Sequence, residues 1–486
     1  MKLPLSVMAF FKKLVEFINE LQSKVTTLQS NLSNVQSENE ALKTRNTELE
    51  RMLKTNSTNS HKPPSTDFGK SKNKNTSVLF PRSGNKKQGG QPGHTGKTLE
   101  ITSTPDNQIY LRPSVCACGM SLKDVEGTIE ECRQVFDVPT PKLVVTQFNR
   151  VACPCPECGA YNTGTFPADV PAHVQYGSGL RALTVLLNNA YHLPLRKVRQ
   201  LMLDLFGYDV NQSTVTSANE ICYDNLKAAE ASIRQAVTEA ETSHFDETGI
   251  EAANKRQWLH TACTALLTYL FFSEHRGAMA MSSEEGVIAD FNGWAVHDCY
   301  ATYFTYDNCK HTLCGAHLLR ELQAQIEEGR KWATLMKDFL LELYQKSDFG
   351  KGVVDDFLPY CLRYDQICNL ADAEEPKPAP KPEKSRGKIK QTKGRNLLDR
   401  LVKHKSAVLA FAQYKEVPFT NNQAERDIRP TKTKQKVSNC FRTVAGAKIY
   451  ARIQGFISTV RKQEQDVFDM LKKSFSPDFV YQFNSG

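Results

Sequence analysis

Long apolar runs are missing from this sequence of 486 residues. No stretch of about 18 or more consecutive apolar residues occurs, so we expect no membrane span. The start of the chain, residues 1–11, is apolar, but it leads into a heptad pattern instead of a small-residue cleavage site, which argues against a signal peptide. Hydrophobic residues make up 40% of the chain, enough to bury a sizeable core. At this length we expect several folded units.

A strong overall charge is also missing. The 62 Lys and Arg residues only modestly outnumber the 53 Asp and Glu residues, so the position of the basic residues matters more than their number. Cysteine occurs 14 times, partly in Cys-x-Cys and Cys-x-x-Cys clusters. In a chain of this length such clusters are typical of metal binding in a reducing compartment and not of a secreted disulfide framework. We therefore expect a cytoplasmic protein.

Proline and glycine are absent from residues 10–54, where apolar residues recur in heptads. One series holds Leu14, Leu21, Leu28, Val35, Leu42 and Leu49, and a second holds Phe11, Ile18, Val25, Leu32, Asn39, Asn46 and Leu53. Together they form the a/d seam of a coiled coil, in which a buried Asn fixes register and strand number at a cost in stability. We predict a self-associating coiled coil over residues 1–54. The alternative is a long helix that packs on its own protein.

Acidic residues are nearly absent from residues 54–97, where Asp67 is the single acid beside nine Lys and Arg residues. Ser, Asn, Thr, Gly and Pro make up much of the rest, so this stretch cannot bury a core and should be disordered when free. We interpret residues 55–99 as a basic arm that neutralises DNA phosphates. A plain linker is the alternative.

Two cysteine knuckles follow within residues 100–175. They read Cys116-Ala-Cys118-Gly119 and Cys153-Pro-Cys155-Pro-Glu-Cys158-Gly159. The glycine at the end of each knuckle lets backbone amides turn toward thiolate sulfur. We predict one structural Zn²⁺ with four cysteine ligands, namely Cys116, Cys118, Cys155 and Cys158. Cys153 is the alternative to one of these ligands, and Cys132 lies between the knuckles.

Residues 176–240 are predicted to be helical. An amphipathic segment from Leu195 to Phe206 ends at Gly207, and Ser213 can cap a second helix that begins at Thr214. This spacing resembles a helix-turn-helix that reads DNA. Two ordinary packed helices are the alternative.

Three acidic residues lie in contexts that suit a metal centre. Asp246 and Asp298 each lie at or near the end of a probable strand, and Glu425 lies at a plausible helix start followed by basic residues. Phosphoryl transfer on DNA uses two divalent cations about 4 Å apart, and carboxylates are natural ligands for Mg²⁺. Glu247 should point to the opposite face of its strand from Asp246, so we do not expect it to be a ligand.

Five phrases carry a resemblance to one family. They are Asn59-Ser-His-Lys-Pro-Pro-Ser-Thr-Asp67, Gly89-Gly-Gln-Pro-Gly-His94-Thr-Gly, His244-Phe-Asp246-Glu-Thr248, Cys314-Gly-Ala-His317-Leu-Leu-Arg320 and Asn422-Gln-Ala-Glu425-Arg426-Asp-Ile-Arg429-Pro430. In this order they resemble the large transposase of the insertion sequence 66 family over nearly the whole chain. The resemblance implies an α/β, RNase H-like core over residues 241–460, a mixed sheet with helices. It also implies a DDE triad, carried onto Asp246, Asp298 and Glu425. Asp290 and Asp307 are nearby alternatives to Asp298.

The resemblance also implies roles around the triad. Cys314 and His317 would orient the metal ligands or position DNA, and we expect the same of three arginines, Arg320, Arg426 and Arg429. Cys309 and His311 could join Cys314 and His317 in a second zinc site. Four ligands so close together on one strand-to-helix segment would fit a single ion poorly, so we prefer the positioning role.

The interval between Asp298 and Glu425 is longer than a minimal sheet-and-helix core needs. We predict a mostly helical insertion at about residues 325–415. It contains a Pro-rich loop from Glu374 and a run of basic residues, 384–395, which either contacts DNA or is simply solvated. Residues 461–486 should form a C-terminal helix and tail.

Together these features predict a DNA transposase that binds transposon ends and target DNA and catalyses strand cleavage and strand transfer. Mg²⁺ or Mn²⁺ would bind at the triad and Zn²⁺ in the knuckles. The family also implies two small accessory proteins of the same element and a bacterial, nucleoid-associated location. One alternative is a zinc-containing DNA-binding repressor with an inactive nuclease-like fold, which loss of a triad acid would favour. Another is a coiled-coil scaffold that binds nucleic acid, which leaves the strand-end acids unexplained.

Overall fold

The structure of the chain is a computed structural model that describes residues 5–56, 59–60, 99–378, 389, 391–476 and 478–485, with side chains from residue 12 onward. Most of the predicted basic arm and much of the Pro-rich stretch, residues 61–98 and 379–388, lie outside the described residues. The chain divides into two compact units. The first comprises Met1–Phe80, Ala316–Glu342 and Leu358–Lys403, and the second comprises Pro81–Gly315, Leu343–Phe357 and His404–Gly486.

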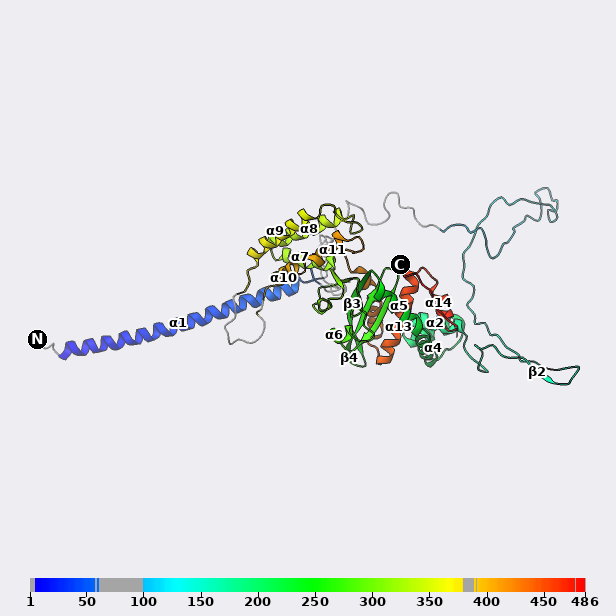
Figure 1. Ribbon diagram of the computed structural model, residues 1–486, viewed down its shortest axis with the longest axis horizontal. Coiled ribbons are helices and arrows are strands. Elements are labelled where there is room, and N and C mark those ends of the chain that lie inside the picture. The colour runs from blue at the N-terminus through cyan, green and yellow to red at the C-terminus, as the bar shows by residue number, and fades with distance from the viewer. Residues whose placement is uncertain are drawn as a thin grey trace. The chain divides into compact units, whose positions relative to one another are not determined.

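The first unit is helical (Figure 1). It contains α1 (Leu5–Lys54), most of α7 (Gly315–Glu327) and α8 (Lys331–Lys346), α9 (Leu358–Glu374) and α10 (Lys393–Lys403). The rings of Phe339 and Tyr364 pack edge to face with 5.9 Å between their centroids. The Tyr364 hydroxyl donates a hydrogen bond to the carbonyl oxygen of Leu401 at 3.0 Å. These contacts tie α8, α9 and α10 to one another, so the stretch expected to be a helical insertion does form helices.

Helix α1 is continuous over 50 residues. Its seam side chains lie on the surface, with Leu28 66% exposed and Leu42 62% exposed. A single copy of α1 therefore leaves its apolar seam in water, and pairing with a second copy would bury it.

Charge in the α1 seam should lower the oligomeric order of the protein. We expect the double change Leu28→Glu and Val35→Glu to reduce the mass measured by light scattering, because a carboxylate in a buried seam loses its hydration. The matched control is Ser30→Glu with Ser37→Glu, which adds the same charge at the same spacing on the outer face of the helix. An unchanged mass for the seam variant would show that α1 does not mediate association.

The second unit is built on a five-stranded mixed sheet with the order β5-β4-β3-β6-β7. The strands are β3 (Thr242–Ala252), β4 (Lys255–Cys263), β5 (Thr268–Ser273), β6 (Trp294–His297) and β7 (Lys310–Leu313). The first three strands pair antiparallel, whereas β6 runs parallel to β3 and β7 parallel to β6. The turn between β3 and β4 consists of Ala253 and Asn254, whose φ angles of 50° and 58° are those of a tight two-residue hairpin. The expectation of a mixed sheet in an α/β fold is confirmed.

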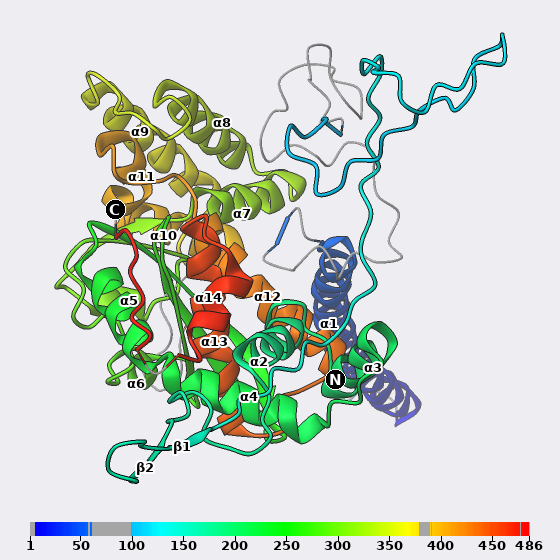
Figure 2. The ribbon, with the colours of Figure 1, turned by 90° about the vertical axis from the view of Figure 1, so that its right-hand side faces the viewer.

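Helices cover both faces of this sheet (Figure 2). Side chains alternate along β3, so Phe245 and Ile250 point to opposite faces. Phe245 packs against Phe291, with 5.4 Å between the ring centroids, on the face that carries α5 (Lys227–Glu239). Ile250 belongs to a buried cluster with residues of α12 (Asn422–Ser438) and α13 (Val444–Lys462). The sheet is therefore a middle layer between two layers of helix and loop.

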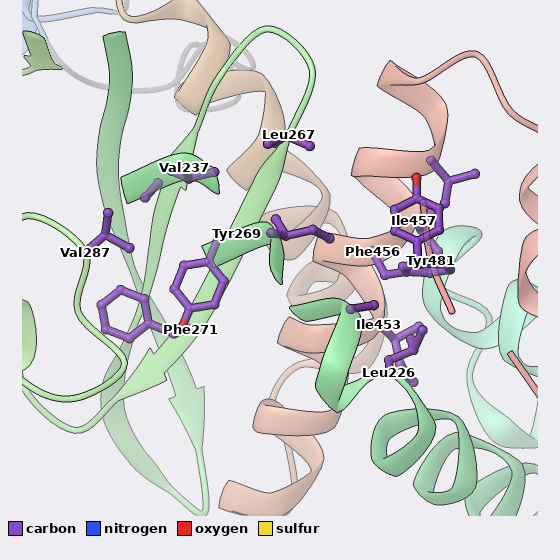
Figure 3. Close-up of a cluster of buried hydrophobic side chains, with 14 of the residues drawn as sticks. Leu226, Val237, Leu267, Tyr269, Phe271, Val287, Ile453, Phe456, Ile457 and Tyr481 are labelled. Carbon is purple, nitrogen blue, oxygen red and sulfur yellow. The ribbon is translucent and has the colours of Figure 1, made fainter. Parts of the chain in front are cut away.

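A buried apolar cluster fixes α13 against the edge strand β5 (Figure 3). Tyr269 and Phe271 of β5 stack with 5.7 Å between their ring centroids. Ile453, Phe456 and Ile457 of α13 belong to the same cluster, and each is at most 3% exposed. Burying these side chains removes several large apolar surfaces from water, which holds the helix layer to the sheet.

Helical segments precede the sheet in the chain. They are α2 (Ser178–Val185), a π-helical turn (Leu186–Ala190), α3 (Leu195–Phe206), α4 (Gln212–Asn225) and α5. The C-terminal helix α14 (Val467–Lys473) packs against α2 (Figure 2). The Asn225 side chain also donates to the carbonyl oxygen of Ser474 at 2.8 Å. α14 thus packs against the helices that precede the sheet in the chain.

The start of α4 differs from the sequence-based prediction. α3 ends at Gly207 as expected, in the left-handed conformation with φ 65°. α4 begins at Gln212, and its N-cap is Asn211, whose side chain accepts a hydrogen bond from the backbone N–H of Ser213. The prediction that Ser213 caps the helix is wrong, because Asn211 is as good a cap and lies two residues earlier.

The remaining elements are short. They are β1 (Ala152–Pro154) and β2 (Tyr161–Thr163), which pair antiparallel, α6 (Ala278–Met281), a 3-10 turn (Tyr303–Thr305) and α11 (Lys405–Gln413). Among the helices that the structure describes, none is long and apolar enough to cross a bilayer.

Candidate active site

Asp246 lies near the middle of β3 and not at its end, which corrects the sequence-based expectation. The strand is long because it continues into the hairpin with β4, whereas its pairing with β6 stops at His244. In that pairing His244 is level with Val296, so Asp246 is level with position 298, directly after β6. Asp246 therefore lies on β3 and Asp298 directly after the neighbouring strand β6, both two residues beyond the last pair of those strands.

The charges of the other predicted carboxylates act on Asp246. Burial raises the pKa of Asp246 well above its usual value, and the charges of Glu247 and Asp298 raise it further. The charge of Glu425 acts in the same direction, while the backbone N–H of Glu247, which donates to Asp246 Oδ1 at 2.9 Å, lowers the pKa. Among the residues that the structure describes, the side-chain oxygens of Asp246, Asp298 and Glu425 are not all within 4.8 Å of one another. The charges of Asp298 and Glu425 act on Asp246, and the role of the three acids as metal ligands stays a prediction.

Glu425 lies in the first turn of α12. Arg429, one turn later, donates to Glu425 Oε2 at 3.3 Å. A carboxylate oxygen of Glu425 and the sulfur of Cys314, at the end of β7, lie within 4.8 Å of each other. The helix dipole favours a carboxylate in a first turn, so the position suits the charge of Glu425.

Asn421 fixes the start of α12 against the sheet. Its side chain donates to the carbonyl oxygen of Phe245 at 2.7 Å and accepts from Nδ1 of His244 at 2.9 Å. Its backbone N–H donates to the Cys314 sulfur at 3.1 Å. Burial lowers the pKa of His244 to about 4, so the ring is neutral and its Nδ1 carries the proton. One buried residue therefore ties α12 to β3 beside Asp246, a role that the sequence did not reveal.

Glu247 points to the other face of the sheet from Asp246, as strand alternation predicts. Its side chain, 1% exposed, accepts hydrogen bonds from Arg276 Nε at 2.8 Å and from the Tyr303 hydroxyl at 2.7 Å. Burial and the charge of Asp298 raise the pKa of Glu247, and these two hydrogen bonds oppose that shift. Glu247 is thus an anchor for the segment after β6.

The backbone of its own loop holds the Asp298 side chain. Asp290 and Asp307, the alternatives to Asp298 as the second acid, have other surroundings. The backbone N–H of Tyr300 donates to Asp298 Oδ1 at 2.9 Å. The side chain of Asp290 is 68% exposed and pairs with Arg234 at 3.4 Å. Asp307 lies shortly before β7, where its charge acts on Cys309 and His311. Of these three acids, Asp298 is the one whose charge acts on Asp246.

Asp427 lies two residues after Glu425, but it faces the sheet and not the triad. Its carboxylate accepts from Lys462 Nζ at 2.6 Å and from the Thr268 hydroxyl at 3.0 Å. The side chains of Asp427 and Lys462 are 8% and 11% exposed. This buried ion pair joins α12, α13 and β5, so Asp427 serves the fold.

Cys309 and His311 have different partners from Cys314. His311 Nδ1 lies 3.0 Å from His297 Nε2, and His311 Nε2 lies 3.9 Å from the sulfur of Cys309. The Cys314 sulfur instead contacts Asn421. This arrangement does not favour a second zinc site that joins the four residues. His317 lies in the first turn of α7 and Arg320 one turn later, both half-buried, so a positioning role for them stays a prediction.

The two cysteine knuckles each form a tight turn. Gly119 and Gly159 have positive φ angles of 89° and 72°, and their N–H groups donate to the carbonyl oxygens of Cys116 and Cys155, both at 2.9 Å. Hydrogen bonds from the backbone of the partner cysteine in each knuckle lower the pKa of Cys116 and Cys155. Within the described ranges, the sulfurs of the two knuckles are not gathered within 4.8 Å of one another. The zinc site stays a prediction.

Arg426 and Arg429 are exposed on α12, and a role for them in positioning DNA stays a prediction.

Family models match two parts of the chain. The family model described as Family of unknown function (DUF6444) matches residues 12–100, which include most of α1. No curated protein matches the chain. The family model described as Transposase IS66 family matches residues 173–449, a span that contains all three acids and the whole sheet. That span is more than half of the 486 residues, so the chain belongs to the Transposase IS66 family.

Proposed function

We propose that this transposase cleaves and joins DNA strands with divalent metal held by Asp246, Asp298 and Glu425. The observation that carries the proposal is the placement of Asp246 on β3 level with Asp298, directly after the neighbouring strand β6, with the charges of Asp298 and Glu425 acting on a half-buried Asp246. The mixed sheet, three antiparallel strands followed by two parallel strands, supports an RNase H-like core. DNA is the partner that a transposase implies, as transposon ends and as target.

The chemistry of the donor set fits a divalent cation. Carboxylates that lie close together, one of them desolvated, disfavour one another's charged form, and a bound cation would relieve this repulsion. Carboxylate oxygens are preferred by both Mg²⁺ and Mn²⁺. When bound, such ions would activate the attacking oxygen and stabilise the leaving oxygen at phosphorus. The residues that would hold them come from β3, from the end of β6 and from α12.

The chain's own contribution is to hold these ligands in a fixed geometry. Asn421 holds α12, and thereby Glu425, beside β3. The backbone N–H of Tyr300 orients Asp298. Glu247 secures the same loop from the far face of the sheet through Tyr303. In phosphoryl transfer such positioning, with electrostatic stabilisation, is most of what a protein supplies.

Cleavage of DNA that carries the element's own ends tests the proposed function. We expect strand cleavage and joining with Mg²⁺ or Mn²⁺ and neither with EDTA. Binding of the ends without cleavage in either metal would favour the alternative, a zinc-containing DNA-binding repressor with an inactive nuclease-like fold. All three acids are present in the sequence, and Asp298, directly after the neighbouring strand β6, lies level with Asp246, which favours the enzyme.

We also propose that Cys116, Cys118, Cys155 and Cys158 hold one structural Zn²⁺. The support is chemical, since each knuckle already turns backbone amides toward a cysteine whose pKa is lowered. Self-association through α1, two small accessory proteins and association with the nucleoid are further proposals.

The purified protein should carry about one Zn²⁺ per chain, because four thiolates complete one tetrahedral site. Cys155→Ser should lose the metal, as measured by elemental analysis. Cys132→Ser is the matched control, since Cys132 is exposed and outside both knuckles. Folded protein without zinc would refute the site. If Cys153→Ser loses the zinc and Cys155→Ser keeps it, Cys153 is a ligand in place of Cys155.

A further inference from the structure

A cavity of about 310 Å³ opens beside α2 and α4, which pack against each other (Figure 2). Its lining includes Tyr176, Arg181, Ser213, Thr214, Ser217 and Ile221. Ser213, Ser217 and Ile221 follow one another at steps of four residues, so they lie on one face of α4. Sites for small molecules in proteins have volumes of roughly 300–1,000 Å³, so the cavity has room for one small ligand.

Two hydroxyl groups of the cavity are not used by the fold. The side chain of Asn211 caps α4, so the helix start does not need the hydroxyl of Ser213. Thr216 donates its hydroxyl to the carbonyl oxygen of Gln212 at 3.2 Å. Within the described ranges, the hydroxyls of Ser213 and Ser217 make no such hydrogen bond to the protein. Both are therefore available to a ligand.

Arg181 gives the cavity a positive charge. In the part of the chain that the structure describes, no carboxylate oxygen lies within 4.0 Å of its guanidinium group. The nearby acid Asp209 is already paired with Arg199 at 2.5 Å. Glu220 lies about one turn beyond Ser217 on α4 and does not line the cavity. A guanidinium group beside hydroxyl donors suits the oxygens of a phosphate.

The rest of the wall is aromatic and aliphatic. Tyr176 packs edge to face against Tyr208, with 6.2 Å between the ring centroids, and this contact holds the ring in place. Ile221 adds an aliphatic surface. Water is the ordinary content of a gap between helices, and a small anion alone would leave the ring and the aliphatic surface uncovered. A nucleotide would cover them, because its base stacks on aromatic side chains while its phosphate meets the polar groups.

We propose that this cavity binds a nucleotide, with the phosphate at Arg181 and the hydroxyls of Ser213 and Ser217, and the base against Tyr176. A DNA strand and a free nucleotide share this chemistry, and the experiments below distinguish the two sources. The proposal goes beyond the proposed function, because none of the three acids of the triad lines the cavity. The two proposals can therefore fail separately.

Calorimetric titration of the full chain tests the class of ligand. The probes are the four deoxynucleoside monophosphates, the same nucleosides without phosphate, and inorganic phosphate. A monophosphate should bind at least about tenfold more tightly than the nucleoside or the phosphate alone, because only the monophosphate makes both sets of contacts. Inorganic phosphate that binds as tightly as the monophosphates would show a plain anion site and overturn the assignment to a nucleotide.

Arg181→Gln distinguishes a phosphate contact from a role in folding. It should weaken binding of the monophosphate by at least about tenfold and leave binding of the nucleoside unchanged. Arg181→Lys should recover part of the loss, since it keeps the charge. Equal weakening of nucleoside and monophosphate by Arg181→Gln, with an unchanged circular dichroism spectrum, would show that the arginine only shapes the cavity, and would overturn the phosphate contact.

Ser217→Leu fills the cavity from an exposed position on α4 and should weaken binding of both the monophosphate and the nucleoside. The matched control is Thr216→Leu, which adds a similar volume at the next residue, also exposed and outside the lining. Its affinities should stay at the wild-type values. Equal effects of Ser217→Leu and Thr216→Leu would place the ligand elsewhere and overturn the proposal.

Anisotropy with a labelled single-stranded oligonucleotide, in EDTA, identifies the source of the nucleotide, since only an unpaired base can enter a cavity. If a DNA strand supplies it, Arg181→Gln and Ser217→Leu should weaken binding of the oligonucleotide by at least about tenfold, and Thr216→Leu should not. Unchanged binding of the oligonucleotide with weakened binding of the monophosphate would assign the cavity to a free nucleotide. Unchanged binding of both probes would overturn the proposal, whatever Glu425→Gln does to cleavage.

Discussion

Glu425→Gln should lower DNA cleavage and joining by at least roughly 1000-fold while the fold and the binding of transposon ends stay near wild type. Gln keeps the size and hydrogen-bonding shape of Glu but lacks the negative charge that would hold a divalent cation. We expect the same of Asp246→Asn and Asp298→Asn. Cleavage of labelled end DNA, with circular dichroism as the check on folding, provides the measurement.

Two triad changes together should cost little more than one, because groups that act as a unit are strongly non-additive. Glu251→Gln is the matched control, an exposed Glu on the same strand as Asp246. Full activity of Glu425→Gln would refute the proposed mechanism. Loss of activity in Asp290→Asn, with full activity in Asp298→Asn, would instead show that Asp290 is the second acid of the triad.

Asp427→Ala should lower the free energy of unfolding by about 3–5 kcal/mol, although it leaves the triad intact. Without Asp427 the ammonium group of Lys462, in a side chain that is only 11% exposed, is left buried without its counter-charge. The Thr268 hydroxyl loses its acceptor on Asp427 as well. Urea denaturation with linear extrapolation measures the change.

Asp469→Ala provides the comparison, because Asp469 pairs with Lys473 at 2.7 Å on the surface, where both side chains are about half exposed. That loss should be below about 1 kcal/mol. Replacing both Asp427 and Lys462 with apolar residues should recover much of the stability, since no unpaired buried charge remains. Equal losses for Asp427→Ala and Asp469→Ala would contradict the structural role of Asp427.

The sequence predicts the broad architecture because local patterns determine it. The probable strand before Asp298 is observed as β6, and the amphipathic segment before Gly207 gives α3 its observed end. Strand alternation alone separates Glu247 from Asp246. The family membership follows from short phrases, and the family match confirms it.

Other features depend on contacts between distant segments. The hydrogen bond between Asn421 and Phe245 joins residues 176 positions apart, so no local sequence pattern predicts it. Asp246 does not end its strand, because β3 continues in the hairpin with β4 beyond the point where its pairing with β6 stops. A proline usually ends a helix, yet α12 continues past Pro430 to Ser438, held by the packing of neighbours such as Ile428.

The burial of one sheet face by α12 and α13 also determines when the protein can fold during synthesis. Ile250, Leu259 and Leu270 are complete about midway through translation, but Tyr450 and Ala451, which cover them, leave the ribosome about two hundred residues later. Until then an apolar sheet face stays open to water, the kind of surface on which chaperones act and from which aggregates start. A message cut short before α12 would therefore yield an insoluble fragment that lacks Glu425, and not a partly active nuclease.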